Sequence, residues 1–350
     1  MDKRWFFGYI ARRLVFLLIT LFCIFTFCFF LIHLLPGANA AGVGQDEAIF
    51  RIRQEAYGYD QPILIQYFLF FKNLFYPFVS DGNGKVYAIS PWGYSTVIEK
   101  GATPESLLAE GLTPTVLVNT YAIIIAIPLG IVLGIALALN RSRFVKGLST
   151  ILIVVFIALP SFAYAFFFQY LFGFRWHILP TDMSLSGFQT NDIRGVNWFD
   201  PSIQKALVLP VLSLIVPTVA GFARVSEAEV NEAIHSPFML SSRAKGMGEF
   251  EAVFAHGLRN AMVPIFPMIL GQLIGVLSGS IIIESVFRIP GVGGLYIKSL
   301  NIGGEHPDYA VFLFLSIFYA FIGLLGSLII DLGYTLIDPR MRVGSAKGDK

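Results

Sequence analysis

Residues 14–35 read LVFLLITLFCIFTFCFFLIHLL, an apolar run in which His33 is the one strongly polar side chain. A helix needs roughly 20 mainly apolar residues to cross a bilayer, because lipid offers no partner for backbone polar groups. A signal peptide is the alternative, but the run is too long for its apolar part and no small-residue cleavage site follows its centre. We therefore expect a retained membrane-spanning helix.

The rest of the composition agrees with a bilayer environment. Of the 350 residues, 55% are hydrophobic and 14% are charged, whereas ordinary soluble domains carry about 25% charged residues. That leaves too little polar surface to cover a soluble globule. Five further apolar runs have the length of spans, at residues 114–139, 150–174, 206–222, 263–284 and 309–332. The sequence thus predicts an all-α integral membrane protein with six transmembrane helices.

Lysine and arginine indicate which side of the membrane is cytoplasmic. Fifteen of the 25 basic residues fall in the tail 1–13, the turn after the second span, the loop 224–262 and the tail 340–350. Short loops rich in Lys and Arg stay inside, so we expect both termini in the cytoplasm. The loop 36–113 would then lie outside, and a loop of that length normally has a structure or function of its own.

The chain lacks the motifs that would let it power or catalyse a reaction alone. It has no phosphate-binding GxxxxGK[ST], no GxSxG or HExxH pattern, and no His/Cys cluster with metal-ligand spacing. Ionisable residues are almost absent from the apolar cores, whereas an ion-coupled carrier usually needs them near the membrane midplane. We expect a non-catalytic chain without a bound metal or cofactor, which is either a passive channel or driven by a partner.

The loop 224–262 is the longest predicted cytoplasmic loop. It contains two short helical patterns, and Gly246-Met247-Gly248 separates them. Ser236 and Pro237 suit the cap and first turn of one helix. The other helix has an apolar face at helical spacing, made of Phe250, Val253, Phe254 and Leu258. Such a face either docks in the groove of a partner or rests on the ends of the spans, and the residues alone leave both possibilities open.

The stretch RAKGMGEFEAVFAHGLRNAMVP at residues 243–264 resembles the cytoplasmic loop motif of binding-protein-dependent ABC permeases, specifically the oligopeptide/dipeptide branch. That branch has a pattern close to RAKG, nine intervening residues, HALRNA and a proline. Here Gly257 stands where alanine is usual, and Leu240-Ser241-Ser242 departs from the usual Glu-Ala-Ala. The residues that we assign to this loop motif are Arg243, Ala244, Lys245, Gly246, Gly248, His256, Leu258, Arg259, Asn260 and Pro264.

Other stretches resemble the same branch, in the order in which the family has them. They are YIARRLVFLLITLFCIFTFCFFLIHLLPG, YGYDQPILIQY, IPLGIVLGIALALNRS, ILPT, ESVFRIPGVGGL and LIDPRMR. One such match would be weak, but this many in family order are strong. The external segment between Phe71 and Glu110 matches least well.

The resemblance implies a type I ABC importer permease fold with residues 114–339 as its core. It also implies a bacterial plasma (inner) membrane location. The implied partners are a second homologous permease subunit, two ATP-binding subunits and an extracytoplasmic solute-binding protein. ATP and Mg²⁺ would be used by the partner ATPases, and no nucleic acid is expected to bind.

The resemblance gives the loop 224–262 the role of a coupling element seated on the ATPase. Gly246 and Gly248 would let the backbone turn sharply and approach the partner closely. Arg243 and Lys245 would meet acidic residues of the ATPase, or would merely follow the positive-inside bias. In this family, closure of the ATPase dimer opens the permease pair outward by a rigid-body movement.

Outside the membrane, the turn IPGVGG is a candidate docking surface for the binding protein. Its residues Pro290, Gly291 and Gly293 would act together with the loop 36–113. The substrate path should lie between this chain and its permease partner, but the sequence does not identify lining residues. One-sided helical faces are hard to recognise when lipid and core are both apolar.

The substrate favoured by the resemblance is an oligopeptide or dipeptide. Nickel complexes and sugars stay open, because the same branch includes members that carry them. An ion-coupled secondary carrier and a membrane scaffold without transport are the rival classes. The first would need midplane charges, and the second would not need a long cytoplasmic loop with an exposed apolar helix.

Overall fold

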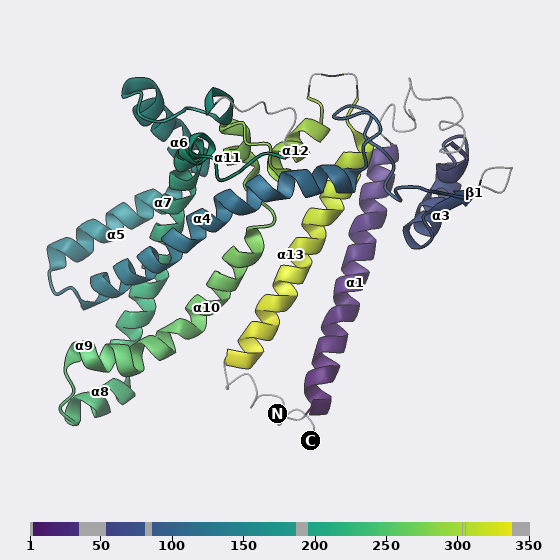
Figure 1. Ribbon diagram of the computed structural model, residues 1–350. Helices are drawn as coiled ribbons and strands as arrows, with labels where there is room; N and C mark the ends of the chain where they lie inside the picture. Colours follow the sequence, from purple (N-terminus) through teal and green to yellow (C-terminus); the bar gives the residue numbers. More distant parts are fainter. Residues whose placement is uncertain are drawn as a thin grey trace.

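Figure 1 shows the computed structural model of the chain. The residues that it describes are 3–34, 54–80, 86–186, 195–302, 304 and 306–337. Within these ranges the only strands form a short antiparallel hairpin, β1 (Phe78–Ser80) and β2 (Val86–Ala88). The other regular elements in the described ranges are helices, so the predicted all-α membrane class is confirmed.

Four described helices are long and apolar enough to cross a membrane as continuous elements. They are α1 (Lys3–His33), α4 (Pro104–Leu139), α7 (Pro201–Ile234) and α13 (Tyr309–Ile337). Helix α4 begins well before residue 114, where we expected the second span to start. The Thr103 side chain accepts a hydrogen bond from the backbone N–H of Ser106 and so caps the helix at this earlier point.

The third predicted span is not a straight helix. It consists of α5 (Arg143–Ala158) and α6 (Ser161–Phe168), and α6 continues as the π-helical stretch Gln169–Arg175. The two parts meet at an angle of 95°. The break lies at Pro160, whose ring disfavours helical geometry in the residue before it, and Leu159 is indeed extended.

The fifth predicted span is divided as well. Helix α10 (Leu258–Gly275) is followed by a turn in which Gly279 has a φ of +65°. The chain then forms the short helices α11 (Ile281–Val286) and α12 (Val292–Ser299). The described chain therefore has four continuous spanning helices, one bent pair and the shorter α10, and the count of six spans stays a prediction.

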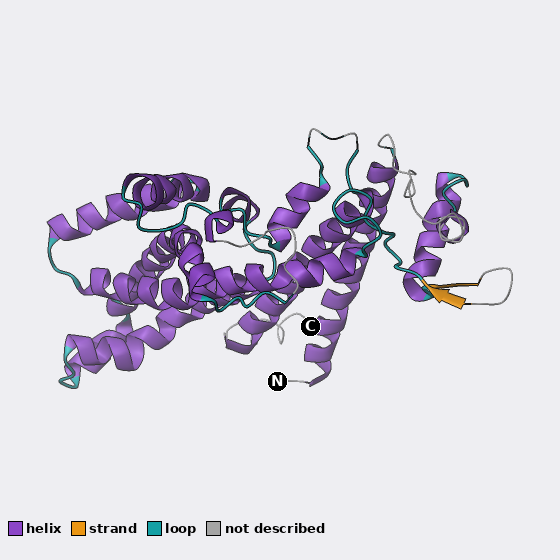
Figure 2. Cartoon of the chain, turned by 45° about the horizontal axis from the view of Figure 1, so that its top comes forward, coloured by secondary structure: helices purple, strands orange, loops and turns teal. Residues whose placement is uncertain are grey.

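The predicted external loop 36–113 has structure of its own where it is described. It contains α3 (Ile63–Phe75) and the β1–β2 hairpin, which lies at one edge of the molecule in Figure 2. Aromatic rings of α3 pack on α1, as in the pair Phe25 and Phe70, whose centroids are 4.8 Å apart. The described part of this segment thus includes a helix that packs on α1.

Helix α1 runs beside α13 in the opposite direction, so the start of one and the end of the other lie at the same end of the molecule (Figure 1). A salt bridge of 2.9 Å joins the guanidinium of Arg13 to the carboxylate of Asp331 near this end. Further along, Phe29 and Ile32 of α1 are buried in a cluster with Leu313.

The backbones of α4 and α7 approach each other closely, and two glycines of α4 permit it. A methyl group on Gly130 would lie 2.6 Å from Cβ of Phe222, and one on Gly134 would lie 2.6 Å from the carbonyl oxygen of Ala223. The spacing GxxxG places both glycines on one side of the helix, where small residues let backbones approach closely in membranes. Helices α4 and α7 therefore form a tightly packed pair.

This packing predicts opposite effects for two glycine-to-alanine substitutions. Gly134→Ala should destabilise the protein by about 1–3 kcal/mol, because the added methyl group pushes against backbone that cannot yield easily. In the control Gly221→Ala, the methyl group meets nothing within 4 Å, and alanine is the better helix former by up to about 1 kcal/mol. Thermal unfolding in detergent should therefore occur at a lower temperature for Gly134→Ala only. Equal melting temperatures for the two variants would contradict the proposed contact.

Candidate coupling and docking sites

The predicted coupling loop forms a compact unit at the end of the molecule opposite α11 and α12 (Figure 1). After α7 ends, the chain forms α8 (Pro237–Ala244), turns, and forms α9 (Glu249–Ala252). A π-helical stretch, Val253–Gly257, then leads directly into α10. The expected helix beginning at Pro237 is confirmed.

The side of this unit that faces α4 and α7 is buried. Met239, Ala252 and Val253 are each 0% exposed and belong to a single apolar cluster. The cluster also includes residues near the ends of α4 and α7, namely Ile135, Ala138, Val230 and Ile234. The loop is therefore packed on both helices.

The apolar face predicted for the second loop helix is divided in the structure. Val253 is fully buried and Leu258 packs partly against the same cluster, whereas Phe254 is 47% exposed. Val253 and Phe254 are adjacent in the helical turn, so they point in different directions and only Val253 reaches the cluster. The side chain of Phe250 lies outside the described part of the chain. One part of the face therefore rests on the spans, and docking of Phe254 on a partner stays a prediction.

The two glycines of the turn have different conformations. Gly246 has a φ of +88°, the left-handed region that favours glycine, so its part in the predicted sharp turn has a structural basis. Gly248 lies outside that region, and a methyl group added to it would meet nothing within 4 Å. Gly257 is buried, but a methyl group there would meet only ordinary contacts at 3.8 Å, so the alanine usual in the family would fit.

The other predicted loop residues lie at this same end of the chain. Ala244, Lys245 and Asn260 are exposed, and Pro264 is partly buried inside α10. The side chains that fall outside the described part of the structure are those of Arg243, His256 and Arg259. The exposed residues make the tip of the unit accessible to a partner.

At the opposite end, the predicted docking turn is built around a buried carboxylate. Glu284 of α11 is 1% exposed. One of its oxygens accepts hydrogen bonds from the backbone N–H groups of Gly293 and Gly294, at 2.8 and 3.2 Å. The other accepts a hydrogen bond of 3.0 Å from the hydroxyl of Thr115 in α4. Thr115 in turn accepts one from the N–H of Val292, at 2.8 Å.

This carboxylate explains why the turn contains glycines. A methyl group on Gly291 would lie 2.7 Å from Cδ of Glu284, and one on Gly293 would lie 2.7 Å from Cα of Ile281. Both glycines are buried, and Pro290 is partly buried. The glycines therefore shape the turn and attach it to α4, and they present little surface themselves. We missed this contact from the sequence because Thr115 and Glu284 are 169 positions apart.

A second buried carboxylate holds the segment that precedes α4. Asp308 is 0% exposed and lies next to the start of α13. One of its oxygens accepts hydrogen bonds from the Ser95 hydroxyl at 2.6 Å and from the backbone N–H groups of Thr96, Val97 and Ile98 at 3.1–3.2 Å. Successive N–H groups that converge in this way form a favourable nest for an anion. The segment is thereby fixed against α13.

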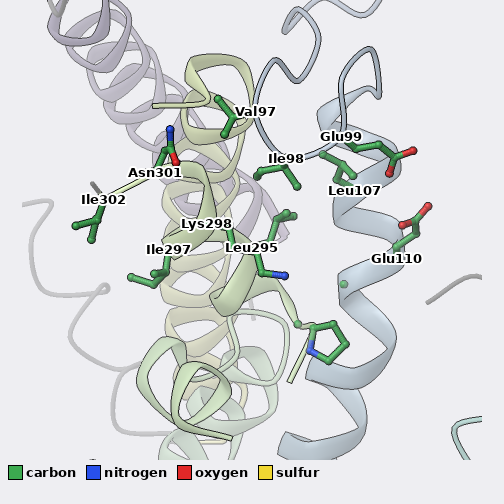
Figure 3. Close-up of a pocket in the computed structure, with 13 residues that line it drawn as sticks. Val97, Ile98, Glu99, Leu107, Glu110, Leu295, Ile297, Lys298, Asn301 and Ile302 are labelled. Atoms are coloured by element: carbon green, nitrogen blue, oxygen red, sulfur yellow. The ribbon is translucent and has the colours of Figure 1, made fainter. Parts of the chain in front are cut away.

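Between these two anchored segments lies a cavity of about 610 Å³ (Figure 3). Its walls come from the segment around Ile98, from the first turns of α4, and from α12 with the turn that follows it. Pro290 and Gly291 line part of it. Among the described residues, no group of three or more His, Cys, Asp or Glu side chains is placed to hold a metal ion.

The Glu284 contacts can be tested through stability. Glu284→Ala leaves two buried donors and one part-buried donor without their acceptor, and each unsatisfied buried group costs about 1–3 kcal/mol. Glu284→Gln keeps the shape and one acceptor oxygen, so its effect should be smaller. We expect thermal unfolding in detergent to rank wild type above Glu284→Gln and Glu284→Ala last. An alanine variant that melts at the wild-type temperature would show that these hydrogen bonds do not hold the turn.

Both of these sites lie in the region of the chain that matches a known protein family. Residues 130–343 match the family described as the binding-protein-dependent transport system inner membrane component. The matched region is more than half of the chain. It includes the loop 224–262, the turn around Glu284 and α13, whereas α1 and α3 precede it.

Curated relatives match over nearly their whole lengths. The dipeptide transport system permease protein of Lactococcus lactis is 30% identical over 335 residues, which are 96% of this chain and 99% of the relative. The oligopeptide transport system permease protein of Haemophilus influenzae is 29% identical, with 95% and 99% covered. The glutathione transport system permease protein of Escherichia coli K12 is also 29% identical, with 96% and 99% covered. The chain therefore belongs to the inner membrane components of binding-protein-dependent transport systems.

Proposed function

We propose that the chain is a permease subunit of an ATP-driven importer of peptides. It would pair with a second homologous permease, bind two ATPase subunits at the end with the coupling loop, and receive peptide from a binding protein at the other end. The observation that carries this proposal is how the loop is packed. Met239, Ala252 and Val253 are buried against α4 and α7, whereas the turn around Lys245 and Gly246 is exposed. The exposed turn does not contribute to the apolar core of this chain. We therefore assign it to contact with a partner.

The peptide substrate is supported by the relatives. The three described above are named for dipeptides, oligopeptides and glutathione, which is itself a peptide. None of these names refers to a nickel complex or a sugar. We therefore assign a peptide to this chain, and ATP with Mg²⁺ to the partner subunits.

Helix α4 offers a physical connection between the two ends. Its residue Ile135 belongs to the cluster under the coupling loop, and its residue Thr115 holds the external turn through Glu284. Twenty residues of helix separate them, about 30 Å at 1.5 Å per residue. A movement of the loop would therefore carry the external turn with it as part of a rigid body, the usual form of such transitions.

The proposed topology follows the positive charges. The tails 1–13 and 340–350 and the loop 224–262 would be cytoplasmic, and the segment 36–113 with the turn around Pro290 would be external. Because Gly291 and Gly293 are buried, the binding protein would contact the exposed residues beside this turn, such as Ile302, which is 81% exposed.

The function is tested by uptake into vesicles that contain the chain with its permease and ATPase partners. With the binding protein present, a tritiated peptide should accumulate only when ATP is supplied. Uptake that persists without ATP and stops when an ion gradient is removed would instead support a secondary carrier.

The coupling role of Gly246 has its own test. Gly246→Val forces a β-branched residue into the left-handed region, which costs about 1–3 kcal/mol and shifts the turn. We expect normal assembly with the ATPase, continued ATP hydrolysis and a loss of peptide uptake of about fivefold or more, the factor to which about 1 kcal/mol corresponds. Gly248→Ala is the matched control, since its added methyl group meets open space. Normal uptake by Gly246→Val would exclude the coupling assignment.

A further inference from the structure

The external cavity has a volume of about 610 Å³, which is within the usual range of small-ligand sites, about 300–1,000 Å³. Its lining includes the apolar side chains of Ile98, Leu107, Leu295 and Ile297. A cavity of this size can hold a few amino-acid residues and keep their side chains partly out of water.

Hydrogen bonds to two buried carboxylates hold the walls of the cavity in place. Asp308 fixes the backbone of Val97 and Ile98 on one side, and Glu284 fixes the turn that leads into α12 on the other. Between them α4 and the turn are in close contact, since a methyl group on Gly111 would lie 3.2 Å from the backbone nitrogen of Val292. The cavity is therefore formed before any ligand arrives, which lowers the cost of binding.

Charged groups of opposite sign line different walls. Glu99 and Glu110 contribute carboxylates from the segment before α4 and from α4 itself, whereas Lys298 contributes an ammonium group from α12. Figure 3 shows Glu99 and Glu110 near each other on the α4 side, with Lys298 on the helix across from them. The site thus offers an acidic wall and a basic group across an apolar interior.

We propose that this cavity is a transfer site for a short peptide with free termini, between its release from the binding protein and its passage through the membrane. The ammonium terminus would face Glu99 and Glu110, the carboxylate terminus would face Lys298, and side chains would contact the apolar lining. This inference rests on the proposed import of peptides and adds to it a site on the permease itself. A loop of the binding protein is the competing occupant, and the experiment distinguishes the two.

The occupant can be identified by photocrosslinking in the assembled transporter. Ile297→benzoylphenylalanine places the photoreactive group in the cavity wall. Phe144→benzoylphenylalanine, at a residue 77% exposed near the start of α5, is the control. Vesicles receive the binding protein, ATP and tritiated trialanine, and are illuminated during uptake. We expect a tritiated adduct of this chain at position 297 and none at position 144.

Charge recognition is tested on the same adduct. Glu110→Gln and Lys298→Met, each in the position 297 background, should lower the adduct yield. Unlabelled trialanine should compete about tenfold better than its N-acetyl, C-amide form, because each terminus loses a charge-assisted hydrogen bond.

Three results would overturn the proposed transfer site while uptake by the parent transporter is normal. They are an adduct with the binding protein in place of the peptide, an adduct that neither charge variant reduces, and no adduct at position 297. Absence of uptake by the parent transporter would instead remove the proposed function on which the inference rests.

Discussion

The close contact between α4 and α7 is the constraint on which the rest of the structure depends. Lipid is as apolar as the side chains of a span, so helices in a membrane associate through packing and not through burial from water. Gly130 and Gly134 let the two backbones meet at distances that no larger residue allows. The resulting pair supports the loop 224–262 at one end, and at the other end both helices pack against the segment around Ile283, Phe287 and Ile289.

The two ends of the helix pair are stabilised by different interactions, apolar packing at one end and hydrogen bonds to buried carboxylates at the other. At the loop end, small and flexible apolar residues such as Ala252 and Met239 fill the space over the helix ends. At the end with α11 and α12, buried carboxylates organise backbone that lies outside regular helices: Glu284 does so for the turn before α12, and Asp308 for the segment before α4. A buried carboxylate with several N–H donors is rigid, because losing any one of them leaves a polar group unsatisfied.

The sequence predicted the features that depend on local pattern. The apolar runs identified the helices, Ser236-Pro237 marked the start of α8, and the motif from Arg243 to Pro264 placed the chain in its family. Features that depend on distant contacts could not be predicted. The proline ring accounts for a break at Pro160, but the angle of 95° and the π-helical stretch at Val253 require knowledge of what packs beside them. Likewise, Gly291 and Gly293 looked like surface residues, and only the contact between Glu284 and Thr115 shows that they are buried.

Under the proposed function, α4 and the turn around Glu284 should move as one body when the loop 224–262 is displaced, and transport would depend on this connection. The most direct measurement is the distance between spin labels at Ala136→Cys, on the exposed side of α4, and Lys298→Cys, on α12, with the native Cys23 and Cys28 replaced by alanine. The assembled transporter would be compared without nucleotide and with ATP trapped by vanadate. We predict the same distance distribution in both states while distances to the partner permease change. A shift of the 136–298 distance between the two states would contradict the rigid connection.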